Sequence, residues 1–301
     1  MKKWLADILK NPPTGAGFDF DENKNSLIDK SNHQKYSIIN NVPVIIPQND
    51  PAVKSELHDN LNTQFNYIDH YQKDAEVFDY FSNKLPKSLQ IEEKLLRKQI
   101  LSEITQNIEL VLDVGCGSAW LARELVKKGK NVVSLDVSLI NTTKALEKIP
   151  APNHAALTAD VYNLPFGENT FDCIVASEIM EHLYDPFLFI QKLIRILKSG
   201  GKLIITTPYK EVLEYNLCIH CNKPTPKNAH IHSFDEKKMR EMIRKLNVKD
   251  TIIRTFNNKL LVKLRLHTLI SSISFNLWQL TDKIIDKLFP RALRIMTVFL
   301  K

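Results

Sequence analysis

The stretch from Leu110 to Leu121 limits what this chain can fold into more than any other feature. It reads Leu-Val-Leu-Asp-Val-Gly-Cys-Gly-Ser-Ala-Trp-Leu. An apolar run ends at Asp113, two glycines follow, and a helical apolar spacing begins at Trp120. The pattern predicts a buried strand, a tight turn and a helix. Because Gly115 and Gly117 lack a Cβ atom, a ligand can approach the backbone closely there, and the helix start supplies unpaired N–H groups beside it.

The chain after this turn repeats the strand-and-helix pattern. Apolar runs that end near Asp136, Asp160, Ser177 and Thr207 predict four more strands. Ligands of open parallel sheets bind at the carboxyl ends of the strands, so polar residues at these ends are candidates for ligand binding. Asp136 follows the glycine turn by about 20 residues, the spacing at which nucleotide folds place a carboxylate on ribose hydroxyls.

Taken together over residues 90 to 256, these motifs resemble those of class I S-adenosylmethionine-dependent methyltransferases. The resemblance implies an α/β, Rossmann-like, seven-stranded sheet with helices on both faces, here over residues 109–301. It implies that the turn from Asp113 to Gly117 holds the amino acid end of the cofactor, that Asp136 binds the ribose, and that Asp160 with the Val161 backbone meets the adenine. The predicted cofactor-binding residues are Asp113, Gly115, Cys116, Gly117, Asp136, Val137, Asp160, Val161, Ser177 and Tyr71.

The residues after the fourth core strand, Ser-Glu-Ile-Met-Glu-His-Leu from Ser177, are similar to the Glu-His-Leu version found in methyltransferases of the quinone-biosynthesis type. The Asn-Pro-Pro-Tyr tetrapeptide of enzymes that methylate amino groups of nucleic acids and glutamine is absent from this position. We therefore predict a small-molecule or lipid-like acceptor, methylated at oxygen or carbon, with His182 as the catalytic base. A structural histidine packed against the sheet is the alternative for His182.

Two other functions remain open at this point. The first is an RNA or protein methyltransferase, because residues 237–301 carry 15 Lys and Arg against 4 Asp and Glu, in a chain of net charge +7. The second is a regulatory module that binds the cofactor without transferring a methyl group.

Residues 1–50 predict a small β-rich module. Leu5 to Leu9 and Tyr36 to Pro47 resemble the small zinc-binding activator protein that partners tRNA, rRNA and release-factor methyltransferases. Asn11, Thr14 and Asp29 stand where that family has cysteines. We therefore expect a module without zinc, held together by packing, that covers an apolar edge of the catalytic domain.

Residues 51–108 predict a linker followed by helices. Phe65, Ile68, Tyr71, Ala75 and Phe78 recur at helical spacing. This helix is either part of the core or a lid over the cofactor, and as a lid it would bring Tyr67, His70 or Tyr71 near the cofactor. A second helix over residues 88–104 leads into the first core strand.

A loop insertion at 208–233 contains a candidate metal site. Thiolate and imidazole suit zinc, and a Cys-x-x-Cys pair followed by His-x-His offers four ligands. The predicted ligands of one structural zinc ion are Cys218, Cys221, His230 and His232. The alternative is a substrate loop with free thiols.

A helical insertion at 257–290 carries an apolar stripe. Its uncharged stretch, from Leu266 to Thr281, is shorter than the roughly 20 residues that span a bilayer, so no transmembrane segment is predicted. The helix either packs on its own protein and forms part of the acceptor pocket, or docks on a membrane surface. The residues that favour docking are Trp278, Lys263, Arg265, Lys283 and Lys287.

The composition is that of an ordinary soluble protein, with 44% hydrophobic and 25% charged residues among 301. Four cysteines do not make a disulfide framework, and the first ten residues lack the long apolar run of a signal peptide. These features predict a reducing, cytoplasmic location.

Overall fold

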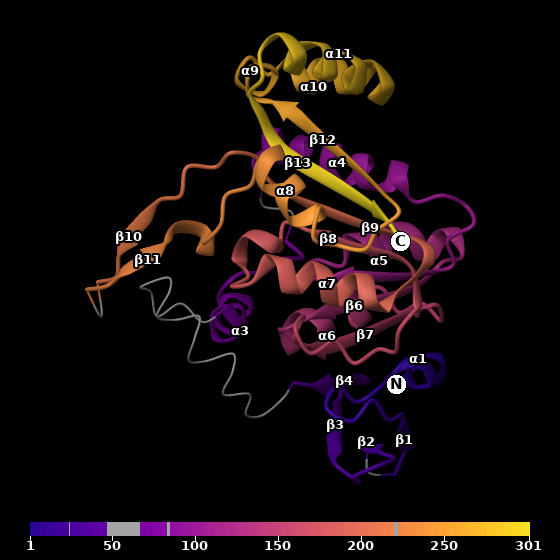
Figure 1. Ribbon diagram of the computed structural model, residues 1–301. Coiled ribbons are helices and arrows are strands. Elements are labelled where there is room, and N and C mark those ends of the chain that lie inside the picture. Colours follow the sequence, from indigo (N-terminus) through magenta and orange to yellow (C-terminus); the bar gives the residue numbers. More distant parts are fainter. Residues whose placement is uncertain (24, 47–66, 83–84, 220–221) are drawn as a thin grey trace.

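A computed structural model describes residues 1–301 except for 24, 47–66, 83–84 and 220–221 (Figure 1). Its strands are β1 (Phe18–Asp21), β2 (Ser26–Asp29), β3 (Lys35–Ile39), β4 (Val42–Ile45), β5 (Leu110–Val114), β6 (Asn131–Asp136), β7 (His154–Ala159), β8 (Phe171–Ser177), β9 (Leu197–Pro208), β10 (Tyr215–Leu217), β11 (Pro224–Pro226), β12 (Asp250–Asn258) and β13 (Ala292–Leu300). Its α-helices are α1 (Lys3–Ile8), α3 (Tyr67–Val77), α4 (Lys87–Glu103), α5 (Trp120–Leu125), α6 (Leu139–Lys148), α7 (Pro186–Ile196), α8 (Glu236–Ile243), α9 (Lys259–Lys263), α10 (Leu266–Ile273) and α11 (Phe275–Leu288).

In the described part of the chain, eleven strands form one sheet in the order β1-β2-β3-β4-β7-β6-β5-β8-β9-β13-β12. The strands from β7 through β9 pair in parallel, and β13 is antiparallel to both β9 and β12. The segment from β7 to β12 in this order is the predicted seven-stranded methyltransferase sheet, which is confirmed.

The sheet is covered on both faces, as predicted. Alternate residues of a strand point to opposite faces, so Leu112 and Val114 pack with α7 and α8 whereas Val111 packs with α4 and α5. Because both faces are buried, each central strand is a continuous apolar run, which is why the sequence reveals it.

The N-terminal strands extend this sheet. β1, β2, β3 and β4 form an antiparallel meander, and β4 then pairs in parallel with β7, with Val44 opposite Thr158 and Ile45 opposite Ala159. The chain therefore covers the β7 edge of the methyltransferase sheet with strands of its own. Figure 1 shows them at the end of the sheet opposite α10 and α11.

A buried hydrogen-bond network organises the N-terminal module. The sequence interpretation expected packing to hold this module together. The Asp29 carboxylate accepts bonds from the Asn11 side-chain amide at 2.5 Å and the Thr14 hydroxyl at 2.6 Å. Its other oxygen accepts from the backbone N–H and hydroxyl of Ser31 and the N–H of Asn32. Burial raises the pKa of Asp29, but these bonds outweigh burial and hold the pKa well below its usual range.

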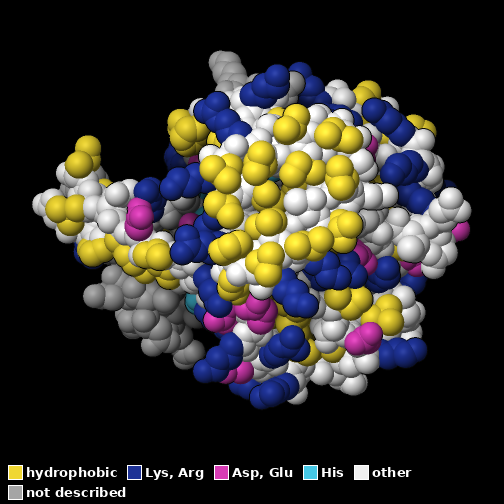
Figure 2. All heavy atoms as spheres, turned by 90° about the horizontal axis from the view of Figure 1, so that it is seen from above, with side chains coloured by type: hydrophobic (Ala, Val, Ile, Leu, Met, Phe, Trp, Pro, Cys, Tyr) yellow, Lys and Arg dark blue, Asp and Glu magenta, His cyan; other side chains and the backbone are white. Residues whose placement is uncertain are grey.

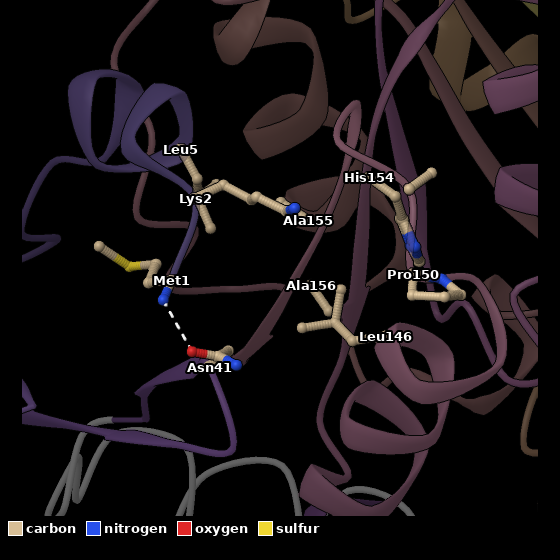
Figure 3. Close-up of a pocket in the computed structure, with 10 residues that line it drawn as sticks. Met1, Lys2, Leu5, Asn41, Leu146, Pro150, His154, Ala155 and Ala156 are labelled. Carbon is tan, nitrogen blue, oxygen red and sulfur yellow. Dashed lines mark hydrogen bonds between the residues drawn. The ribbon is translucent and has the colours of Figure 1, made fainter.

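A hollow remains at the boundary between the N-terminal module and the rest of the sheet. Figure 3 shows a hollow of about 260 Å³ between the first residues and the β7 side of the sheet. The amino terminus of Met1 donates to the Asn41 side chain across 3.0 Å beside it. Trp4 donates to the Pro152 carbonyl at 3.3 Å, so polar contacts also join the two parts.

Two predicted elements differ from the structure. The apolar stripe from Leu266 to Leu288 is carried by two helices, because the chain breaks at Ser274, whose hydroxyl accepts the Leu277 N–H and begins α11. The helix expected over 65–78 is α3, and Phe65 lies outside the described residues. Among the described helices, none is long and apolar enough to cross a membrane.

We predict that Asp29→Ala lowers the melting temperature by roughly 5 °C, because it leaves several buried donors without an acceptor. Thermal unfolding followed by circular dichroism measures this. The matched control is Asp19→Ala on β1, which removes only an exposed ion pair with Lys30 and should change little. Equal melting temperatures for the two variants would contradict the organising role of Asp29.

Candidate functional site

A cavity of about 650 Å³ lies at the carboxyl ends of β5, β6 and β8. Helix α3, one face of α4 and the β10–β11 hairpin with the residues after it supply the remaining walls. Nine of the residues predicted to bind the cofactor or catalyse line it, namely Tyr71, Gly115, Cys116, Gly117, Asp136, Val137, Val161, Ser177 and His182. The sequence motifs therefore converge on one cavity.

The loop after β5 has the backbone that its glycines require. Gly115, Gly117 and Ala119 have φ values of +67°, +46° and +50°. A Cβ at Gly115 would lie 2.1 Å from Cδ1 of Ile179, so the Ile179 side chain, and not a ligand, approaches the Gly115 backbone closely. At Gly117 the nearest atom to a Cβ is Cδ1 of Tyr80 at 3.6 Å. A Cβ atom at Gly117 would therefore meet only the Tyr80 ring, at ordinary contact distance.

Asp136 fixes this loop to the next one. One carboxylate oxygen accepts the Gly117 N–H at 3.0 Å and the Asn141 amide at 3.5 Å, and the other accepts the Ser138 N–H at 2.9 Å. Burial raises the pKa of Asp136, and these bonds oppose the shift. A carboxylate oxygen accepts more than one bond, so the residue retains capacity for ligand hydroxyls.

The sequence predicts that Asp113 binds the cofactor. In the structure Asp113 lies beneath the loop and is not one of the residues that line the cavity. It is 2% exposed, and its Oδ2 atom has no hydrogen-bond partner among the described residues. Burial, together with the neighbouring Asp136, raises the pKa of Asp113 to about 8. The floor of the cavity therefore holds two buried acids that repel each other, an arrangement that a cation in the cavity would relieve.

Helix α3 forms the roof, which favours the lid interpretation over a plain core helix. Tyr67, His70 and Tyr71 all line the cavity, and the Gln72 side chain donates to the Val137 carbonyl at 2.7 Å. The roof is therefore tied to the residue after Asp136.

The side chain of Asp160, which was predicted to meet the adenine, bonds groups of the protein. Its carboxylate accepts the hydroxyl of Tyr67, the Tyr162 N–H and the Asn163 amide, and it does not line the cavity. Val161 does line it. Asp160 thus holds the roof helix down instead of presenting its side chain to a ligand.

His182 lines the cavity and lies next to the residues that follow β11. Its Nδ1 atom is 3.1 Å from the Ala229 carbonyl, which can only accept, so Nδ1 carries the proton and Nε2 the lone pair. Burial and the adjacent His230 lower the pKa of His182 to about 3, which keeps the ring neutral. Its ring packs edge-on against Tyr71, with centroids 5.4 Å apart.

His230 and Glu181 complete a cluster around His182. The two imidazole centroids are 4.7 Å apart, and His230 Nδ1 lies 2.5 Å from the Glu211 carboxylate. Glu181 is buried, and its Oε1 atom has no hydrogen-bond partner in the described residues. Burial and Glu178 raise the pKa of Glu181 well above its ordinary value.

In the described part of the chain, this cluster is the one set of three whose ligand atoms lie within 4.8 Å of one another. Two imidazoles and a carboxylate could hold a divalent metal ion.

The predicted zinc site is not assembled. Its described members, Cys218, His230 and His232, are not brought together, and Cys221 lies outside the described residues. His232 Nε2 instead bonds the Tyr184 carbonyl at 3.2 Å, and Cys218 is part of the turn after β10. The Cys-x-x-Cys spacing is local, whereas a tetrahedral site also needs the two histidines to reach it.

The C-terminal insertion does not contribute to this cavity, contrary to expectation. None of the residues 257–290, all of which are described, lines it, and neither does Tyr209. Residues that sequence reasoning missed are Ile179, Trp120, Asn141, Ala229 and His230 as a neighbour of His182, whereas Tyr80 belongs to the 51–108 region that was expected to cover the cofactor. Only the position of Ile179 beside the Glu-His-Leu segment could have pointed to any of them.

Comparison with known proteins supports the interpretation of the fold. Residues 112–205 match a family model described as a methyltransferase domain. The ubiquinone biosynthesis O-methyltransferase of Colwellia psychrerythraea is 33% identical over 130 residues, which are 40% of this chain and 52% of that protein. The protein of the same name from Coxiella burnetii is 35% identical over 112 residues, which are 36% of this chain and 48% of that protein. The chain spans about half the length of the curated relatives it matches.

Solved structures show the same fold. A protein from Listeria monocytogenes superimposes with a TM-score of 0.51 at 12% identity, covering 70% of this chain and 99% of that one. The PH0226 protein from Pyrococcus horikoshii OT3 gives a TM-score of 0.50 at 16% identity, covering 76% and 98%. These likenesses show the fold, and residues 112–205, which match the methyltransferase-domain model, are distantly similar to the ubiquinone biosynthesis O-methyltransferases.

We predict that binding of S-adenosylmethionine releases up to about one proton near pH 7, because a cation in the cavity favours the ionised forms of Asp113 and Asp136. With a pKa of about 8 in the free protein, Asp113 is mostly protonated below that pH, so affinity should rise as the pH increases from 6 toward 7.5. Calorimetry in buffers of different ionisation enthalpy counts the released protons. The Asp113→Asn variant should bind with a weaker pH dependence, and an unchanged dependence would contradict this account.

Proposed function

We propose that this chain transfers a methyl group from S-adenosylmethionine to an oxygen or carbon of a small-molecule or lipid-like acceptor. The observation that carries the proposal is that His182 and the Gly115–Gly117 loop line the same cavity. Cofactor and base would thus face the same cavity, as a direct displacement at the methyl carbon requires.

The cavity residues fit S-adenosylmethionine. The missing Cβ at Gly117 leaves the backbone accessible on the side where the Tyr80 ring lies, and the unpartnered Asp113 oxygen makes the floor favourable for a cation. Asp136 would hold the ribose hydroxyls, Val137 and Val161 would flank the adenine, and Tyr71 would cover the site. When bound, the cofactor supplies a methyl group already activated on a sulfonium.

The protein's part in the reaction is to align the nucleophile and accept its proton. His182, neutral with its lone pair on Nε2, would accept a hydrogen bond from the acceptor hydroxyl or acidic C–H group. The Nε2 atom would orient the acceptor toward the methyl carbon and relay its proton to solvent, while the sulfonium would leave as a neutral thioether. The aromatic rings of Tyr67 and Tyr71 would keep water from the reacting atoms.

The lining of the cavity favours a small or lipid-like acceptor over nucleic acid. A nucleic acid site would present free cations to phosphates. The Lys and Arg residues among the described lining residues are instead paired with carboxylates. Arg97 lies 2.8 Å from Glu93, Lys227 2.6 Å from Glu214, and Arg294 3.2 Å from Glu178.

The names of the curated relatives also favour an acceptor with an aromatic hydroxyl. The Glu-His-Leu segment lies within the matched methyltransferase domain. The regulatory alternative has no comparable support, because the glycine loop, Asp136 and His182 are all present at the cavity.

We predict that His182→Gln lowers the rate of methyl transfer by roughly 100-fold while changing affinity for S-adenosylhomocysteine by no more than about twofold. Transfer is measured with methyl-labelled S-adenosylmethionine and catechol or a prenylated catechol as acceptor. The matched control is His232→Gln, whose Nε2 atom bonds the Tyr184 carbonyl and which lies outside the cavity.

A second arm separates two roles of His182. If it acts as a base, a chelator leaves the wild-type rate unchanged. If it instead holds a metal with Glu181 and His230, the chelator abolishes transfer and an added divalent ion restores it. Methylation of total RNA without methylation of the hydroxylated aromatics would contradict the proposed acceptor class.

A further inference from the structure

The helices α10 and α11 turn their apolar stripe outward. Large apolar side chains on them are exposed, with Leu269, Ile273 and Leu288 exposing 61%, 70% and 65% of their surface. Leu277, Leu280 and Ile284 continue the same surface. Figure 2, which looks down on this end of the molecule, shows hydrophobic side chains gathered across it. We call these six residues the outer face.

The orientation is fixed by polar contacts on the opposite side. Asp282 is 3% exposed and accepts the backbone N–H groups of Asn257 and Asn258 at 2.9 and 2.7 Å. Asp286 accepts the hydroxyl of Thr255 at 2.6 Å and the side-chain amide of Asn258 at 2.8 Å. A helix that rolled its leucines inward would lose these bonds to buried groups, which is costly.

Aromatic packing adds to this anchorage. Trp278, which the sequence interpretation assigned to a membrane contact, is fully buried and stacks on Phe275 with centroids 5.4 Å apart. Lys98 of α4 lies over the Phe275 ring, and Gln279 donates to Gln99 at 3.0 Å. The tryptophan therefore attaches α11 to the body of the protein and leaves the leucines and isoleucines outside.

The exposed charges of the segment that carries the outer face are of one sign. The exposed charged residues from 259 to 291 are Lys259, Lys263, Arg265, Lys283, Lys287 and Arg291. The two acids of this segment, Asp282 and Asp286, face inward and are hydrogen-bonded. Dark blue side chains border the apolar area in Figure 2.

We propose that the outer face of α10 and α11 docks on an anionic membrane surface. Its leucines and isoleucines would enter the boundary between head groups and acyl chains, and its rim of Lys and Arg would contact anionic head groups. Neither helix is long enough to cross a bilayer: α11 has 14 residues and α10 has 8. A second copy of this chain fits the face poorly, because two such rims would bring like charges together.

The test uses the full chain and sedimentation with vesicles. We expect binding to vesicles of phosphatidylcholine with about one third phosphatidylglycerol, weaker binding to phosphatidylcholine alone, and release by salt. The variant Ile273→Asp/Ile284→Asp should reduce partitioning at least roughly tenfold. Its matched control is Val212→Asp, at an apolar residue that is 81% exposed but outside the outer face.

A charge variant tests the rim. Lys283→Glu/Lys287→Glu should also weaken binding roughly tenfold or more, whereas Lys237→Glu/Lys245→Glu, on exposed residues in and just after α8, should have little effect. Binding of S-adenosylhomocysteine confirms that each variant is folded. Vesicle binding needs neither cofactor nor acceptor, so its outcome is independent of the proposed activity.

Two results would overturn the proposal. One is wild-type protein that stays in solution with anionic vesicles. The other is a wild-type protein that does not bind vesicles but dimerises with increasing concentration in sedimentation velocity. If the Ile273→Asp/Ile284→Asp variant removes this dimerisation, the outer face binds a second copy of the chain.

Discussion

The Asp136 carboxylate is the interaction on which most of the cavity depends. It accepts N–H groups from Gly117 and Ser138, which belong to the loops after β5 and β6. Because neighbouring parallel strands end side by side, one carboxylate can hold both loops. Gln72 then joins the roof helix to the residue after Asp136. The floor and the roof of the cavity are therefore attached to two adjacent residues, Asp136 and Val137. A ligand that bonds Asp136 would contact the point at which they are connected.

A second buried carboxylate plays a similar part at the far edge of the sheet. Asn11 and Thr14 both donate hydrogen bonds to the Asp29 carboxylate. Hydrogen bonds to a charged acceptor are stronger than neutral ones, so a carboxylate can gather these loops without a metal. The result is a meander that sets β4 against β7 and so pairs a strand edge that would otherwise be exposed to other chains.

The sequence predicts the central sheet well because its signals are local. Buried parallel strands are continuous apolar runs, and the glycine turn and Asp136 lie next to them along the chain. The pairing of His182 with His230 joins residues 48 apart and has no local signal. The periodicity of α10 and α11 shows an apolar stripe but not the side to which it turns. That direction depends on Asp282 and its partners on β12, which are far from it in the sequence. The described members of the predicted zinc site are also separated along the chain, so the sequence does not show that the fold keeps them apart.

Helix α4 gives the docking face and the cavity a common wall. Glu93, Leu96 and Arg97 of α4 line the cavity, whereas Lys98 and Gln99 contact α11. Successive residues of a helix point in different directions, so one helix can serve both surfaces. A protein that rested on a bilayer through α10 and α11 would hold its cavity one helix away from the lipid. For the proposed lipid-like acceptor, partitioning into the bilayer would raise its concentration beside the protein.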